Sequence, residues 1–298
     1  MCFKLSKSSF YLVIIFAVLI IIAGCTTTVE QEEISDQEAV EEIEEIEEKE
    51  QGNSDSKEFE SGEGESGENE STSKDQLTED NISEQEPKAL YKVNETNWKV
   101  ESLTESEKNI VLLTIDDAPD KYSTDMADTL NELGAGAIFF VNGHFIESEK
   151  GQADLKRIHD MGFEIGNHTM NHPNLKELSE EEQYREIVEL NDLIEEVTGE
   201  RPRFFRAPFG ANTAYTESVV RDEGMILMNW TYGYDWEAEY MEKEALADIM
   251  VNTPLLTNGA NILMHDREWT MEAIEDIVTG LKEKGYDIVE PREIKGLE

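Results

Sequence analysis

From about residue 100 onward, short apolar runs alternate with longer stretches in which apolar and polar residues follow helical spacing. The apolar runs predict seven strands, over 110–115, 137–141, 164–166, 204–207, 225–230, 261–264 and 287–289. The amphipathic stretches predict helices over 124–133, 152–161, 180–197, 215–223, 242–251 and 271–284. This alternation is typical of an α/β fold in which helices cover a parallel sheet. Seven strands in about 195 residues favour a distorted (β/α) barrel.

The stretch over 180–197 carries clear signals for the start and the end of a helix. Ser179 and Glu182 have the spacing of a capping box, and Gly199 follows the last apolar position. In folds of this class, functional groups gather at the carboxyl ends of the strands. The ends of the predicted strands are therefore the places where candidate chemistry is expected.

The first residues of the chain have the features of an export signal. Lys4 and Lys7 precede an unbroken apolar or aromatic run over 10–23, which is short for a membrane span and typical of a secretory signal. The run ends in Ile22-Ala23-Gly24-Cys25, which resembles the bacterial lipobox. We expect residues 1–24 to be a lipoprotein signal peptide and Cys25 to carry lipid on the outer face of the cytoplasmic membrane. An ordinary signal peptide or a short anchor helix is the alternative.

Residues 25–87 have too few apolar positions to bury a core, and we expect a disordered acidic linker. The whole chain has a net charge of -43, and residues 30–87 contribute -21 of it, with 24 acids and 3 bases. Residues 88–298 carry -24, with 44 acids and 20 bases. This balance excludes a nucleic-acid partner, which requires a basic surface, and it disfavours direct docking on anionic lipid. Contact with the membrane is therefore expected through the lipid anchor only.

Two adjacent carboxylates end the first predicted strand. Asp116 and Asp117 follow the apolar run 110–115 and precede Ala118-Pro119. Two neighbouring carboxylates are costly unless a cation or a shared proton separates their charges. The alternative is an ordinary Asp-rich turn before proline.

Two of the five histidines of the chain lie four residues apart, just after the third predicted strand. Imidazoles of His168 and His172 placed in this way can converge on one ion. With one carboxylate they form a two-His, one-carboxylate set that leaves positions open for water and substrate. Two solvent-facing loop histidines are the alternative. His144 follows the second predicted strand and could line the same site.

Further polar residues fall at the ends of the later strands. Arg206 lies within the predicted strand 204–207, and its guanidinium could hold a carboxylate by forked hydrogen bonds. Asp235-Trp236 follows the strand over 225–230, and His265-Asp266 follows the strand over 261–264. Because the strands are expected to be parallel, all these side chains should meet at one edge of the sheet.

Residues 105–292 resemble the polysaccharide deacetylase family (carbohydrate esterase family 4, the NodB-homology domain) in five motifs, in the order that the family has. The matching segments are Thr114-Ile115-Asp116-Asp117-Ala118-Pro119, His168-Thr169-Met170-Asn171-His172-Pro173, Arg206-Ala207-Pro208-Phe209, Asp235-Trp236 and Leu263-Met264-His265. The chain departs from the family pattern at Ile115 and Ala118, where the family has Phe and Gly. The resemblance implies that 100–298 is a deacetylase catalytic domain.

The resemblance also implies roles for individual residues. It implies one divalent metal, zinc in most members and cobalt or another transition ion in some, bound by Asp117, His168 and His172. It implies Asp116 as general base toward the attacking water and His265 as general acid toward the leaving amine. The remaining roles are Arg206 orienting Asp116, Asp235 tuning His265, the backbone N–H of Phe209 holding the oxyanion, and Trp236 and Leu263 enclosing the acetyl methyl group. Ordinary core packing is the alternative for Trp236 and Leu263.

The resemblance implies a hydrolase acting on carbon–nitrogen, non-peptide bonds. We expect it to remove N-acetyl groups from amino-sugar residues of an extracellular polysaccharide, and a monomer is expected. An exported lipoprotein on a spacer meets peptidoglycan first, so its N-acetylglucosamine or N-acetylmuramic acid is the preferred substrate. The alternatives are an O-acetyl esterase on xylan-like glycan, a non-catalytic glycan-binding lipoprotein, and a surface interaction protein whose acidic linker is the working part.

Overall fold

The computed structural model describes residues 88–105 and 108–297. The predicted signal peptide, the lipidated Cys25 and the acidic linker over 25–87 lie outside the described residues, so they stay predictions. Within the part that is described, no helix is long and apolar enough to cross a bilayer.

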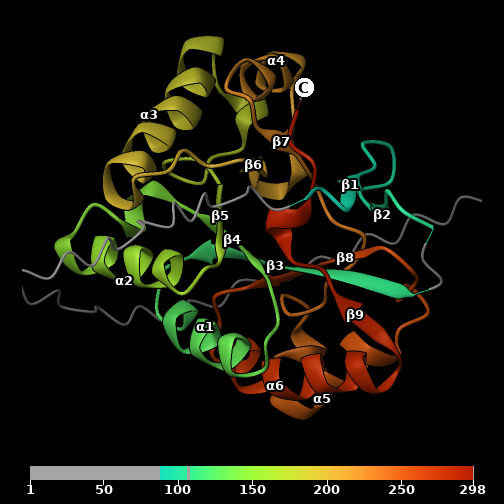
Figure 1. Ribbon diagram of the computed structural model, residues 1–298. Helices are drawn as coiled ribbons and strands as arrows, with labels where there is room; N and C mark the ends of the chain where they lie inside the picture. Colours follow the sequence, from blue (N-terminus) through green and yellow to red (C-terminus); the bar gives the residue numbers. More distant parts are fainter. Residues whose placement is uncertain (1–87, 106–107, 298) are drawn as a thin grey trace, which may run out of the picture. The chain divides into compact units, whose positions relative to one another are not determined.

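The centre of the fold is a curled sheet of seven parallel strands, which confirms the predicted α/β barrel-like class (Figure 1). The strand order is β7-β6-β5-β4-β3-β8, and β9 pairs with β3. Tyr232 forms an isolated parallel bridge with Ile262 on β8 and so adds a contact to that edge of the sheet. The strands are β3 Asn109–Ala118, β4 Ile138–Val141, β5 Glu164–Asn167, β6 Phe204–Phe205, β7 Ile226–Leu227, β8 Ala260–His265 and β9 Tyr286–Ile288.

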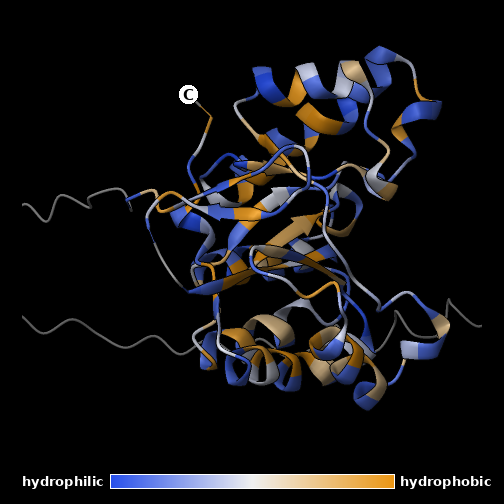
Figure 2. Ribbon diagram, turned by 90° about the vertical axis from the view of Figure 1, so that its right-hand side faces the viewer, coloured by the Kyte–Doolittle hydropathy of each residue, from blue (hydrophilic) through white to orange (hydrophobic). Residues whose placement is uncertain are grey.

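All six predicted helices are present and lie outside the sheet (Figure 1). In Figure 2 their apolar positions turn toward the strands and their polar positions turn away. The capping box of Ser179 and Glu182 is formed, and Gly199 ends that helix in the left-handed conformation. The helices are α1 Ser123–Glu132, α2 Glu149–Asp160, α3 Glu180–Thr198, α4 Ala214–Asp222, α5 Lys243–Asn252 and α6 Glu268–Glu283.

Two strands are shorter than the apolar pattern predicts. The prediction of a strand over 225–230 is wrong at its end, because β7 stops at Leu227. The N–H of Met228 still bonds to Phe205, but the carbonyl of Asn229 then accepts from the Arg206 guanidinium at 3.0 Å instead of from a strand neighbour. β6 likewise ends at Phe205, before the polar site begins.

A short antiparallel hairpin, β1 (Tyr91–Val93) and β2 (Val100–Ser102), precedes the sheet and was not predicted. Its strands have three residues each, too few to show an alternating pattern. The N–H of Val100 bonds to the carbonyl of Gly259 at 2.8 Å, and Val100 is buried in the same apolar cluster as Ile110 and Leu112. The hairpin therefore packs against the amino-terminal end of the sheet.

The alternation along β3 separates two cores. Ile110 and Leu112 face the inner cluster, whereas Val111, Leu113 and Ile115 pack in the outer cluster beneath the helices. A side chain two residues along a strand returns to the same face. Thr114 and Asp116 therefore continue the inner face of β3, and the same alternation on β8 directs His265 inward.

A glycine in the left-handed conformation lies between each helix and the next strand, at the amino-terminal edge of the sheet. These glycines are Gly134, Gly162, Gly199, Gly224, Gly259 and Gly285.

Candidate active site

The carboxyl ends of the strands enclose a cavity of about 570 Å³. Nine of the ten residues predicted for catalysis, metal or substrate line it, and the tenth, Arg206, is buried behind Asp116. The nine are Asp116, Asp117, His168, His172, Phe209, Asp235, Trp236, Leu263 and His265. Residues that are up to 149 positions apart in sequence thus meet at one edge of the sheet, as the parallel topology requires.

Asp116 and Arg206 form a fully buried ion pair. The guanidinium donates to Oδ1 of Asp116 at 2.6 Å and to the hydroxyl of Thr114 at 2.8 Å, and its carbon lies 4.3 Å from the centre of the Phe140 ring. Arg206 is 0% and Asp116 is 2% exposed. The other oxygen, Oδ2, lies 3.5 Å from Nε2 of His168. The arginine therefore fixes one oxygen of Asp116 and leaves the other turned toward the histidines.

Asp117, His168 and His172 bring one ligand atom each to within 4.8 Å of one another. Oδ1 of Asp117 lies 3.4 Å from Nε2 of His172 and 3.9 Å from Nε2 of His168. The Nδ1 of His168 donates to the carbonyl of Arg206 at 2.7 Å, so its Nε2 carries the lone pair that faces the carboxylate. A metal-bound histidine usually donates its second nitrogen in this way. The donor set and its orientation fit a divalent transition metal.

The ionisation states also suit metal binding. Burial lowers the pKa of His168, despite the nearby Asp116 and Asp117, which favours the neutral imidazole that can bind a metal. Burial acts to raise the pKa of Asp117, but electrostatic interactions with His168, His265, His172 and Arg267 outweigh it and lower the pKa overall. Asp117 is therefore an anionic ligand at neutral pH.

On the other side of the cavity, His265 is paired with Asp235. Its Nδ1 donates to Oδ1 of Asp235 at 2.8 Å, and its backbone N–H donates to Oδ2 at 2.6 Å. Thr270 donates to the same Oδ2, and the indole of Trp269 donates to the carbonyl of Asp235. Burial acts to lower the pKa of His265, but the charge of Asp235 and its hydrogen bond raise the pKa above its ordinary value.

Four non-glycine residues around the site adopt the left-handed backbone conformation: Asp117, Thr169, His172 and Phe209, with φ of 62°, 71°, 56° and 59°. Outside glycine this conformation is costly, and it persists where the surroundings over-determine it. Two of the four are candidate metal ligands, so the surrounding structure holds these side chains in a conformation that an isolated loop would not adopt.

The three predicted substrate residues differ in exposure. Leu263 is 3% exposed, whereas Trp236 is 42% and Phe209 is 69% exposed. The Trp236 ring meets the His265 ring edge to face at 5.4 Å, and Phe209 meets His172 in the same way at 5.0 Å. Leu263 therefore forms a closed apolar wall, while the two aromatic rings form an open rim.

The prediction from sequence missed four further residues that line the cavity. They are Trp230, Met241, Arg267 and Trp269. Arg267 donates to Oδ2 of Asp117 at 2.7 Å and follows directly on His265-Asp266, so its position beside a predicted motif was the available signal. Met241 follows no such motif.

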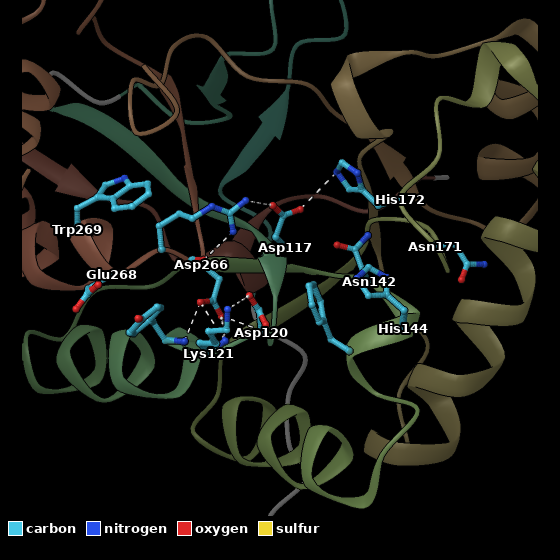
Figure 3. Close-up of a pocket in the computed structure, with 13 residues that line it drawn as sticks. Asp117, Asp120, Lys121, Asn142, His144, Asn171, His172, Asp266, Glu268 and Trp269 are labelled. Atoms are coloured by element: carbon cyan, nitrogen blue, oxygen red, sulfur yellow. Dashed lines mark hydrogen bonds and ion pairs between the residues drawn. The ribbon is translucent and has the colours of Figure 1, made fainter. Parts of the chain in front are cut away.

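A second cavity of about 700 Å³ adjoins the first and shares Asp117, His172, Arg267 and Trp269 with it. Figure 3 shows Asp117 and His172 turned toward each other above Asn142 and His144. His144 is exposed and lines this neighbouring cavity, not the first one. His144 therefore lines the adjoining cavity together with Asp117 and His172, and not the cavity that holds the other predicted residues.

Comparison of the sequence with known proteins also indicates a polysaccharide deacetylase. The profile of a family described as "Polysaccharide deacetylase" matches residues 103–228. A peptidoglycan-N-acetylglucosamine deacetylase of Bacillus cereus is 33% identical over 191 residues, which cover 61% of this chain and 68% of that protein. The peptidoglycan-N-acetylmuramic acid deacetylase PdaC of Bacillus subtilis is 30% identical over 192 residues, 63% of this chain but 39% of PdaC.

Solved structures agree with the fold. The structure of PdaC superimposes with a TM-score of 0.56 at 29% identity, over 63% of this chain and 90% of the solved chain. BA3943 of Bacillus anthracis, described as a CE4 family pseudoenzyme, superimposes with a TM-score of 0.55 at 31% identity, over 61% of this chain and 63% of that one. The fold is thus shared by proteins described as deacetylases and by one described as a pseudoenzyme.

Proposed function

Since the chain belongs to the polysaccharide deacetylase family, we propose that it is a metal-dependent hydrolase that removes N-acetyl groups from amino-sugar residues of cell-wall peptidoglycan. The observation that carries the proposal is the convergence of a complete set of groups on one cavity: a buried carboxylate, three metal ligands and a histidine paired with a carboxylate. This completeness favours an enzyme over a non-catalytic glycan-binding protein on the same fold.

Asp117, His168 and His172 would hold the metal, and zinc suits two imidazoles and one carboxylate. When bound, the ion supplies Lewis-acid polarisation of the acetamide carbonyl and lowers the pKa of water at its open position. The chain's own residues supply the remaining steps.

Asp116 is proposed as the general base. Its Oδ1 is occupied by Arg206 at 2.6 Å, so Oδ2, on the side of His168, is the oxygen that can take the proton of the attacking water. Arg206 touches no substrate in this scheme and acts by holding Asp116 in one orientation. The backbone N–H of Phe209, at the rim beside His172, is proposed to stabilise the oxyanion.

His265 is proposed as the general acid. The carboxylate of Asp235 can only accept, so Nδ1 of His265 is the donor in their bond and Nε2 is left to protonate the leaving amine. The raised pKa of His265 keeps the imidazolium populated near neutral pH, as this role requires.

The shape of the cavity supports a small acyl group beside a sugar. Leu263 closes the apolar wall where the acetyl methyl group would lie, and the open rings of Trp236 and Phe209 offer flat apolar surfaces to a sugar. An O-acetyl ester on a xylan-like glycan presents the same acetyl group and remains the second candidate.

Mass spectrometry of products tests the proposal. The purified protein would be incubated with N-acetylglucosamine oligomers, with peptidoglycan fragments and with acetylated xylan. We expect loss of acetyl groups from amino sugars, and no loss with Asp116→Asn, which retains the metal ligands. Asp120→Asn, in the turn that follows β3 and outside the catalytic cavity, is the matched control and should remain active. Release of acetate from xylan alone would replace the N-deacetylase by an esterase, and no release from any substrate would favour a non-catalytic protein.

We further propose that the enzyme is exported and tethered through Cys25 to the outer face of the cytoplasmic membrane, with residues 26–87 as a spacer. This proposal rests on the sequence Ile22-Ala23-Gly24-Cys25 after an apolar run. A Cys25→Ala variant should leave the membrane fraction after export, and retention of that variant in the membrane would contradict the tether.

A further inference from the structure

Asp266 follows His265 at the end of β8 and has no part in the chemistry described above. It is 1% exposed, so its carboxylate must be satisfied by the protein itself. Figure 3 shows it directly above Asp120 and Lys121. The carboxylate accepts the backbone N–H groups of Asp120, Lys121, Tyr122 and Ser123 and the hydroxyl of Ser123, at 2.6 to 3.2 Å.

These bonds cap the start of α1. The first N–H groups of a helix have no partner within the helix, and Tyr122, at the N-cap position, makes no capping bond with its own side chain. A carboxylate at this end is also favoured by the helix dipole. Asp266, which lies 143 positions away from Ser123 in sequence, supplies both the hydrogen-bond acceptors for these N–H groups and the negative charge at the start of the helix.

The same residue also contacts the end of β3, which precedes the turn that leads into α1. The backbone N–H of Asp266 donates to the carbonyl of Asp116 at 3.0 Å. The end of β3 that carries Asp116 and Asp117, and the turn that follows it, are therefore both held by the residue that follows β8. The next residue, Arg267, binds Oδ2 of Asp117, which leaves Oδ1 turned toward His172.

This end of β3 needs the support because Asp117 has a left-handed backbone with φ of 62°. A non-glycine residue relaxes from that conformation when its surroundings do not enforce it. If the end of β3 relaxed, Oδ1 of Asp117 would move away from the histidines, and the three ligand atoms would no longer be within 4.8 Å of one another.

We propose that Asp266 is a positioning residue for the metal centre, which holds the strained end of β3, with Asp116 and Asp117, in the conformation that binds the ion. The inference rests on the proposed function, since it concerns the same site. It gives the second residue of the His265-Asp266 pair a role distinct from that of the first.

The test compares Co²⁺ binding by the full-length wild-type protein and by Asp266→Asn, after removal of bound metal. Asn offers one acceptor oxygen where the carboxylate offers two, so several of the N–H groups lose their partner. We expect affinity for Co²⁺ to fall about 10- to 100-fold, the usual cost of losing an outer-sphere partner. The visible absorption spectrum of bound Co²⁺ should change, and amide exchange over 117–123 should accelerate in the metal-free variant.

Ser148→Ala is the matched control, because Ser148 caps α2 by accepting the N–H of Gly151 at 3.1 Å, away from the site. It should lower thermal stability and leave Co²⁺ affinity and spectrum unchanged. If Asp266→Asn does not fold, Ser123→Ala, which removes only the hydroxyl donor, replaces it, with a smaller loss of affinity expected.

Wild-type Co²⁺ affinity and spectrum in the variant, together with lower thermal stability, would overturn the inference and leave Asp266 as an ordinary helix cap. A wild-type protein that binds no Co²⁺ would instead refute the proposed function. Failure of the inference would thus be seen in the Asp266→Asn variant, and failure of the proposed function in the wild-type protein.

Discussion

Replacement of Arg206 by Met tests the central electrostatic feature of the site. Met keeps much of the side-chain volume but removes the guanidinium, so it leaves Asp116 as a carboxylate that is 2% exposed and has lost its partner at 2.6 Å. Breaking a buried ion pair by removing one member costs about 3–5 kcal/mol, because the remaining charge is uncompensated. For a domain of about 200 residues this lowers the melting temperature by roughly 6 to 20 °C.

The measurement is urea unfolding of the metal-free protein, followed by circular dichroism, with the slope m compared between variants. Metal is removed because a bound cation would partly compensate the charge of Asp116. The control is Arg157→Met, because Arg157 is likewise paired with an aspartate, Asp128, at 2.7 Å, but that pair is about half exposed. Its loss should cost about 0–1 kcal/mol.

A double variant separates the charge from the packing. Asp116→Asn removes the charge that Arg206→Met leaves uncompensated, so the two changes together should cost less than the sum of the single changes, by about 1–3 kcal/mol. If Arg206→Met costs no more than Arg157→Met, or if the two effects at the site simply add, the buried pair does not dominate the energetics of this site and the reasoning is refuted.

Three further predictions concern the chemistry. Asp235→Asn should move the alkaline limb of the pH–rate profile to lower pH, because Asp235 raises the pKa of His265 and the general acid must be protonated; an unmoved limb would exclude this pair as the acid. His172→Ala should lose zinc in metal analysis of the purified protein, whereas His144→Ala, in the neighbouring cavity, should keep it; retention in both would contradict the ligand assignment. Trp236→Ala should raise KM for sugar oligomers more than it lowers kcat, as expected of an exposed ring that binds sugar; an effect on kcat alone would place the ring at the reacting group instead.

The sequence predicts the sheet well because short apolar runs mark the buried strands and polar residues mark where the strands end. All seven strands of the central sheet and all six helices lie within a few residues of the ranges that the sequence pattern predicts. The end of β7 could not be predicted, since Met228 and Trp230 are as apolar as a strand requires. What ends the strand is a tertiary contact, the bond from the Arg206 guanidinium to the carbonyl of Asn229.

The candidate site was predictable where motifs carry it and not where only packing does. Asp117 and His265 stand at strand ends in a recognisable order. Met241 and Trp269 come to the cavity through the loop before α5 and through the first turn of α6, and no local pattern marks either of them. The left-handed backbone at Phe209 likewise has no signal in the sequence, because that conformation is imposed by the surrounding structure.

The two edges of the sheet differ in the type of residue that adopts the left-handed backbone conformation. At the amino-terminal edge every such turn between a helix and a strand is a glycine, for which the conformation carries no steric penalty. At the catalytic edge Asp117, Thr169, His172 and Phe209 adopt it. The two edges of the sheet can therefore be engineered independently. Fusion points, immobilisation tags and circular permutations belong at the glycine edge, where they leave the site unchanged, and selection for new substrates belongs at the other, where each gain in activity has to be achieved without relaxing the strained loops.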